Sequence, residues 1–153
     1  MRTLHQFSFA DGASAAVEFA IILPAILLFV AGLIDYGNVM TISTRVNSSL
    51  RAATQYAMAY PKDSSGITAA GTSATNDTRL SVGAPTLFCT CGPWGLATST
   101  APAACPVDCS AATVKTQNFY VSVTATESYT PLLPFKGLGA ALTVSNTATI
   151  QVE

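Results

Sequence analysis

The stretch GASAAVEFAIILPAILLFVAGLIDYGNVM, residues 12–40, decides the architecture of this chain. Between Glu18 and Asp35 every residue is apolar, glycine or proline, and the small residues before Glu18 extend the run to about the 20 residues that cross a hydrocarbon core. Backbone groups in lipid must be satisfied within their own segment, so residues 14–37 are predicted to form a transmembrane α-helix. Pro24 removes one helical hydrogen bond and is expected to bend this helix.

A cleaved secretory signal is the competing interpretation of the same stretch. Such a signal would end on a small-x-small cleavage site, and the sequence IDYGNV after Leu33 contains none. The segment is therefore interpreted as a retained anchor. Basic residues lie on both sides of it, so the positive-inside rule does not decide its orientation.

The composition suits a membrane-anchored protein. The 153 residues allow one modest domain and one membrane segment, and only 10% are charged, against about 25% in soluble domains. A formal net charge of −1 and the absence of a basic run in the sequence argue against nucleic acid as a partner. Membrane lipid is the first expected partner.

Glu18 is the unusual residue of the stretch, because an ionised carboxylate at membrane depth costs a few kcal/mol unless it is paired. It either lies at the interface and snorkels or has a function. A glycine upstream, small residues between, a phenylalanine after it and a proline six positions later favour a function. This pattern, with AVEFAIILP and DYGN as its strongest parts, resembles the N-terminal segment of TadE-like proteins, minor pseudopilins of the bacterial tight-adherence (Tad/Flp) pilus systems.

The resemblance implies several functional residues and partners. A prepilin peptidase would remove a cytoplasmic leader, residues 1–13, by cutting near Gly12, Ala13 and Ser14. Cleavage after Gly12 places Glu18 at the sixth mature position, whereas cleavage after Ala13 places it at the fifth, as in the family. Glu18 would then pair with the new N-terminal amine of an adjacent pilin subunit and set the register between subunits.

Small residues of the stretch could allow helices to approach closely; they are Ala31, Gly32 and Gly37. Beyond the span the helix is predicted to continue as an amphipathic segment, residues 38–60, and to end at Pro61. Its packed stripe recurs at steps of three and four and comprises Val39, Ile42, Val46, Ser49, Ala53, Tyr56 and Tyr60. The residues expected on the opposite face are Asn38, Thr41, Thr44, Arg45, Asn47, Ser48 and Arg51.

The remaining residues, 61–153, are predicted to form an extracytoplasmic head. Residues 62–78, rich in Ser, Thr, Gly and Ala, are expected to be a flexible loop. Alternating apolar residues predict strands at 118–127 and 142–152, with a weaker strand near 79–82. The predicted fold class is α+β: a pilin-like long N-terminal helix, its first half transmembrane, packed on a small antiparallel β-sheet head with a disulfide-stapled loop.

Four cysteines lie in that loop, residues 89–109: Cys89, Cys91, Cys105 and Cys109. Their C-x-C and C-x₃-C spacing differs from paired C-x₂-C zinc knuckles, and no histidine lies nearby. Two disulfides are the simpler expectation on the exported side of a membrane. A Cys89–Cys91 ring would be strained, so the pairs should link the C-x-C unit to Cys105 and Cys109, in either order. Oxidation would also place the N-terminus in the cytoplasm and the head in the periplasm.

No catalytic set is evident in the sequence. The single histidine, His5, lies in the predicted leader, and no phosphate loop, zinc-protease or dinucleotide motif occurs. The sequence predicts neither an enzyme, a cofactor nor a metal site. The leading hypothesis is a minor pseudopilin of the bacterial inner membrane that takes part in pilus assembly and is incorporated in the filament or primes it. The alternatives are a static single-pass anchor displaying a disulfide-stapled adhesion head, and a Cys₄ metal sensor.

Overall fold

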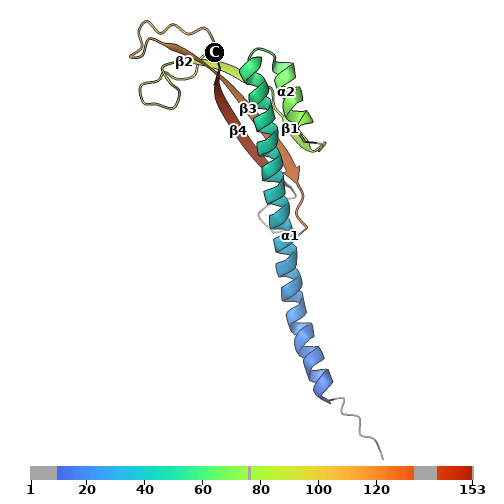
Figure 1. Ribbon diagram of the computed structural model, residues 1–153. Coiled ribbons are helices and arrows are strands. Elements are labelled where there is room, and N and C mark those ends of the chain that lie inside the picture. The colour runs from blue at the N-terminus through green and yellow to red at the C-terminus, as the bar shows by residue number, and fades with distance from the viewer. Residues whose placement is uncertain (1–9, 76, 133–140, 153) are drawn as a thin grey trace, which may run out of the picture.

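The structure, a computed structural model, describes residues 10–75, 77–132 and 141–152. One helix, α1 (Ala10–Ala59), runs for 50 residues without interruption and remains helical through Pro24. Figure 1 shows its N-terminal half projecting away from the rest of the protein, while its C-terminal half lies along a sheet. The predicted single long helix is confirmed, and it ends two residues before Pro61.

The sheet is antiparallel and is built around one central strand. Its strands are β1 (Leu80–Val82), β2 (Thr86–Cys91), β3 (Gln117–Tyr129) and β4 (Leu142–Val152). Glu127 of β3 pairs with Leu80 of β1 on one side and with Val144 of β4 on the other. Ser122 pairs in the same way with β2 and β4. β1 and β2 therefore follow one another along one edge of β3, and β4 occupies the other edge.

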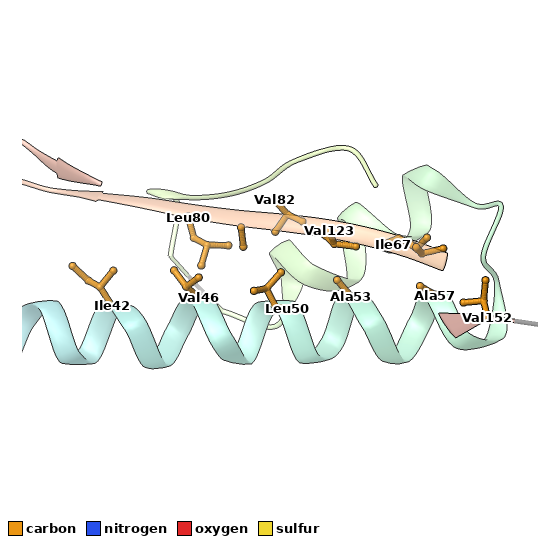
Figure 2. Packing of buried hydrophobic residues seen from close by; sticks show 12 residues of the cluster. Ile42, Val46, Leu50, Ala53, Ala57, Ile67, Leu80, Val82, Val123 and Val152 are labelled. Atoms are coloured by element: carbon orange, nitrogen blue, oxygen red, sulfur yellow. The ribbon is translucent and has the colours of Figure 1, made fainter. Parts of the chain in front are cut away.

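The core lies between α1 and the sheet, and Figure 2 shows its side chains directed toward one another from both layers. Alternate residues of β3 face the helix, and small residues of α1 let the two layers approach closely. The buried members are Ile42, Val46, Leu50, Ala53, Ala57, Ile67, Leu80, Val82, Val121, Val123, Ala125 and Val152. The predicted fold class, α+β with a helix packed on an antiparallel sheet, is confirmed.

The region predicted to be a flexible loop contains a second helix, α2 (Ser64–Ser73), so that prediction is wrong. The Asp63 carboxylate caps it by accepting the Gly66 N–H at 2.9 Å, and Ile67 is fully buried in the core. Gly71 fits closely against Ala53, and its carbonyl accepts the Ser49 hydroxyl at 2.8 Å. The burial of Ile67 and the cap by Asp63 thus stabilise a helix in a segment whose composition is typical of loops.

The packed stripe of α1 also differs in detail from the prediction. Ile42, Val46, Ser49 and Ala53 are buried as expected, whereas Tyr60 is exposed because it lies beyond the end of the helix. Three residues expected on the opposite face instead lie beside the sheet: Asn38, Arg45 and Asn47. Asn38 and Asn47 form hydrogen bonds with residues of β3 and β4, and Arg45 forms one with Asp77 before β1. The packed face is therefore wider than an apolar stripe alone indicates.

Candidate functional site

The projecting half of α1 is the first candidate site, because its apolar side chains are exposed among the residues that the structure describes. Among the described residues, one helix is long and apolar enough to cross a membrane, and its best 18-residue window reaches a mean hydropathy of 2.6. Side chains from Ala15 to Val30 are exposed, Glu18 among them. An apolar surface of this length is satisfied by lipid or by the helices of neighbouring subunits. This arrangement indicates a single-pass membrane protein.

The predicted cleavage region lies at the start of this helix. Gly12, Ala13 and Ser14 fall in the first turns of α1, whereas most of the predicted leader, residues 1–9, lies outside the described residues. Processing at this position, the leader and the boundaries assigned to span and head stay predictions. The same holds for the role of Glu18 in subunit register.

Asp35 lies where the exposed apolar part of α1 gives way to the part packed on the sheet, and the sequence alone indicated no role for it. The Tyr129 hydroxyl donates a hydrogen bond to its carboxylate, and the Leu132 N–H donates to the same oxygen, Oδ1, at 2.9 Å. Asn38, one turn further along α1, donates to the Tyr129 hydroxyl at 3.1 Å. The hydrogen bond to Asp35 raises the pKa of Tyr129. An aspartate closing an apolar run is the sequence signal that could have identified this joint.

A cluster of four charged residues lies next to this joint: Arg45, Asp77, Arg79 and Glu127. Asp77 accepts from Arg45 Nη1 at 2.6 Å and from Arg79 Nη2 at 2.9 Å. Hydrogen bonds from the Arg79 side chain and backbone lower the Asp77 pKa to about 2. The buried Glu127 carboxylate faces the Arg45 guanidinium at 3.5 Å. Arg45 thus faces two acidic groups, one from β3 and one from the segment before β1.

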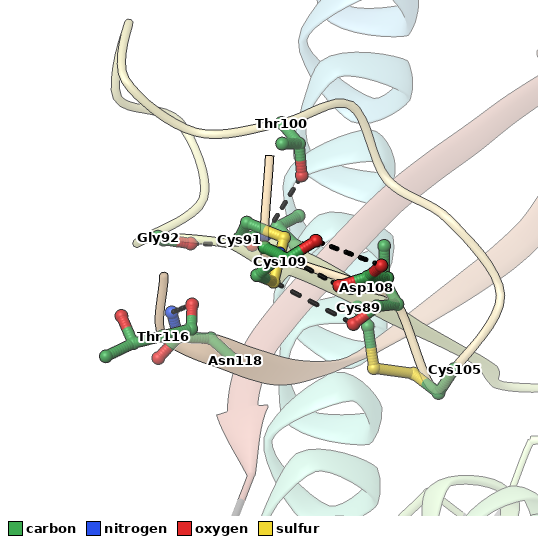
Figure 3. Close-up of a disulfide and its surroundings, with 12 residues drawn as sticks. Cys89, Cys91, Gly92, Thr100, Cys105, Asp108, Cys109, Thr116 and Asn118 are labelled. Carbon is green, nitrogen blue, oxygen red and sulfur yellow. Dashed lines mark hydrogen bonds between the residues drawn. A yellow bond between two sulfur atoms is a disulfide. The ribbon is translucent and has the colours of Figure 1, made fainter. Parts of the chain in front are cut away.

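The cysteines form two disulfides, Cys89–Cys105 and Cys91–Cys109, which settles the pairing that the sequence left open. Cys89 and Cys91 belong to β2 and not to the loop, contrary to expectation. Cys89 also exchanges two backbone hydrogen bonds with Ala103, so the loop covers the outer edge of β2 (Figure 3). All four thiols are oxidised, and this contradicts the Cys₄ metal sensor.

An aromatic cluster lies on the sheet face opposite the core. Phe88 and Tyr120 stack with ring centroids 5.4 Å apart, and Trp94 meets Phe88 edge-on at 5.5 Å. The Trp94 N–H of the backbone donates to the Tyr120 hydroxyl at 3.0 Å. Trp94 nevertheless remains 46% exposed, so it packs in the head and also offers a contact surface.

No group of three or more His, Cys, Asp or Glu residues that could hold a metal ion is found within the described part of the chain. Residues 13–55 match the family model described as TadE-like protein. No curated protein and no solved structure matches the chain significantly. The family match lies entirely within α1, so the disulfide-containing head falls outside it.

Proposed function

Because the chain carries a TadE-like segment over residues 13–55, we propose that it is a minor pseudopilin that takes part in assembling a Tad/Flp-type pilus. The TadE-like family consists of pilus components and is not a family of enzymes. The observation that carries the proposal is the uncovered apolar half of α1, continuous with a helix that anchors the head. Such an apolar surface has to be covered by lipid before assembly and by the helices of neighbouring subunits after it.

Glu18 is the residue to which this proposal assigns subunit register. It is the one acidic residue between Ala15 and Ile34, and it is exposed at the start of the apolar surface. A carboxylate there gains free energy when an adjacent subunit supplies a positive charge, for which the amine of a processed N-terminus is suitable. The proposed topology places the N-terminus in the cytoplasm and the oxidised head in the periplasm.

The test uses a bacterium that makes a Tad pilus and in which this chain replaces the host's own TadE-like protein. We expect Glu18→Ala to abolish or strongly reduce surface filaments counted by electron microscopy, and Glu18→Asp to retain part of the assembly. Equal filament numbers in Glu18→Ala and the parent chain would overturn the role of Glu18.

Processing is tested separately by intact mass and N-terminal analysis of the chain from its native membrane. A mature chain beginning at Ala13 or Ser14 would support action of a prepilin peptidase. A chain still beginning at Met1 would refute processing and favour an uncleaved accessory protein.

An adhesive head is the second candidate function, and the exposed Trp94 favours it. Its ring lies on a loop held by two disulfides, which is a rigid way to present an aromatic contact. Under this alternative, Trp94→Ala reduces attachment of the bacterium while filament number and protein level stay unchanged. Under the pseudopilin proposal alone, attachment per filament does not change.

A further inference from the structure

A polar pocket of about 210 Å³ lies between α1 and the sheet, next to Asp35. Its lining residues are Asn38, Thr41, Ile42, Arg45, Arg79 and Tyr129. The two guanidinium groups supply the hydrogen-bond donors of this lining, because the Tyr129 hydroxyl already donates to Asp35 and the Asn38 amide already donates to Tyr129. Donors of this kind, arginine above all, suit a phosphate oxygen.

The pocket lies at the level where a membrane surface is expected. The 20 residues from Ala15 to Ile34 span about 30 Å as a helix, which matches the hydrocarbon core and places Asp35 at its border. The headgroup layer extends about 5–8 Å further on each side, and Asn38 lies about 4.5 Å beyond Asp35 along the helix. The near wall of the pocket therefore lies within the headgroup layer.

The Arg45 side chain extends toward this layer. The Cα of Arg45 lies about 15 Å beyond Asp35, but side chains of a helix lean toward its N-terminus, which here is the membrane side. The Arg45 and Arg79 side chains are 39% and 57% exposed. Asp77 accepts from one nitrogen of Arg45 and from two of Arg79, and the Glu127 carboxylate faces the same Arg45 nitrogen. Because a guanidinium carries five N–H donors, each arginine keeps donors for a further anionic group.

We propose that this pocket binds the phosphate of a phospholipid headgroup from the leaflet next to the head. The inference rests on the proposed single-pass topology and adds a specific lipid contact to it. A lipid fits better than free phosphate because the acyl chains would continue along the exposed apolar surface of α1. Leu132, 62% exposed and bonded through its N–H to Asp35, presents further apolar surface at the same level.

The test uses the full chain in nonionic detergent, titrated with dioleoylphosphatidylglycerol and analysed by native mass spectrometry. We expect one lipid to bind more tightly than the others. Arg79→Gln should weaken that binding about tenfold, since a charge-assisted hydrogen bond is lost. Arg51→Gln is the control, because Arg51 is an exposed arginine of α1 that does not line the pocket.

Arg45→Gln is a second variant that should weaken lipid binding. Arg45→Gln also removes the partner of Glu127, so its circular dichroism must match that of the parent chain before its binding is compared. Equal lipid affinity in Arg79→Gln, Arg51→Gln and the parent chain would overturn the proposal. Displacement of the lipid by inorganic phosphate at comparable concentration would also overturn it, in favour of a free-anion site. Lipid binding is measured without filaments, so its failure is distinguishable from failure of the pseudopilin proposal.

Discussion

Tyr129 at the end of β3 donates its hydroxyl to the Asp35 carboxylate of α1, so two residues 94 positions apart meet where the head begins. The same carboxylate oxygen accepts the Leu132 N–H, at the start of the connection to β4. One buried side chain of α1 thus fixes both the last residue of a strand and the segment that follows it.

We expect Tyr129→Phe to lower the free energy of unfolding by about 1.5–3 kcal/mol, because a hydrogen bond to a charged group is lost while the ring remains. Tyr36→Phe is the matched control, since Tyr36 is an exposed tyrosine next to Asp35 and should change stability little. Denaturant unfolding of the full chain in detergent, followed by circular dichroism, measures the free energy of unfolding of both variants. Equal stability of the two variants would contradict the role given to the Asp35–Tyr129 contact.

The disulfide pairing makes a prediction about free thiols. Cys89→Ser with Cys105→Ser removes one native pair and should leave no free thiol under denaturing conditions. Cys89→Ser with Cys109→Ser breaks both pairs and leaves two cysteines without their partners. The structure predicts two titratable thiols in this second variant and none in the first; the reverse result would indicate the other crossed pairing.

Loss of one disulfide should also destabilise the head. Cys91 and Cys109 are separated by 18 residues, and closing a loop of that length stabilises a fold by about 3 kcal/mol in the chain-entropy model. Replacing both by serine should lower the free energy of unfolding by roughly that amount. Denaturant titration measures the loss, and exchange of backbone amides should rise first in the loop after β2.

The second helix can be tested through its buried residue. Ile67→Ala should cost about 2–4 kcal/mol, because it leaves a cavity between α2, α1 and the sheet. Thr72→Ala, on the exposed side of α2, should stay within about 0.5 kcal/mol of the parent chain. If both variants were equally stable, α2 would not contribute to the core.

The lowered pKa of Asp77 predicts a stability loss in acid. Its folded-state pKa of about 2 lies below the ordinary value of 3.8, so its contribution is fully present above about pH 4 and disappears as the pH falls toward 2. Thermal unfolding over that range measures the slope. Asp77→Asn should reduce the slope without abolishing it, because hydrogen bonds led by the Gly66 N–H also lower the pKa of Asp63. An unchanged slope would contradict the Asp77 contribution.

Periodicity was sufficient to predict the long helix and the two long strands. The apolar run from Phe19 to Ile34 has one stable conformation in lipid, and the alternation along 142–152 reproduces the bounds of β4. The weaker strand near 79–82 was also found, as β1. In the strands the alternation itself indicates which face is buried, and in the helix the length of the apolar run indicates the conformation.

What the sequence did not reveal depends on contacts between distant segments. The composition of α2 is that of a loop, and Ile67 becomes informative only when α1 and the sheet surround it. The charged cluster joins four residues from α1, β3 and the segment before β1, and no local spacing indicates that they meet. The order of the disulfide pairs likewise follows from the path of the loop along β2.

The unbroken course of α1 from the apolar half into the core has a mechanical consequence. Its 50 residues form a rod of about 75 Å, and no loop separates its two halves. A continuous helix transmits force and rotation along its axis. A displacement or rotation of the apolar half would therefore also displace the strands that pack against Val46, Leu50 and Ala53.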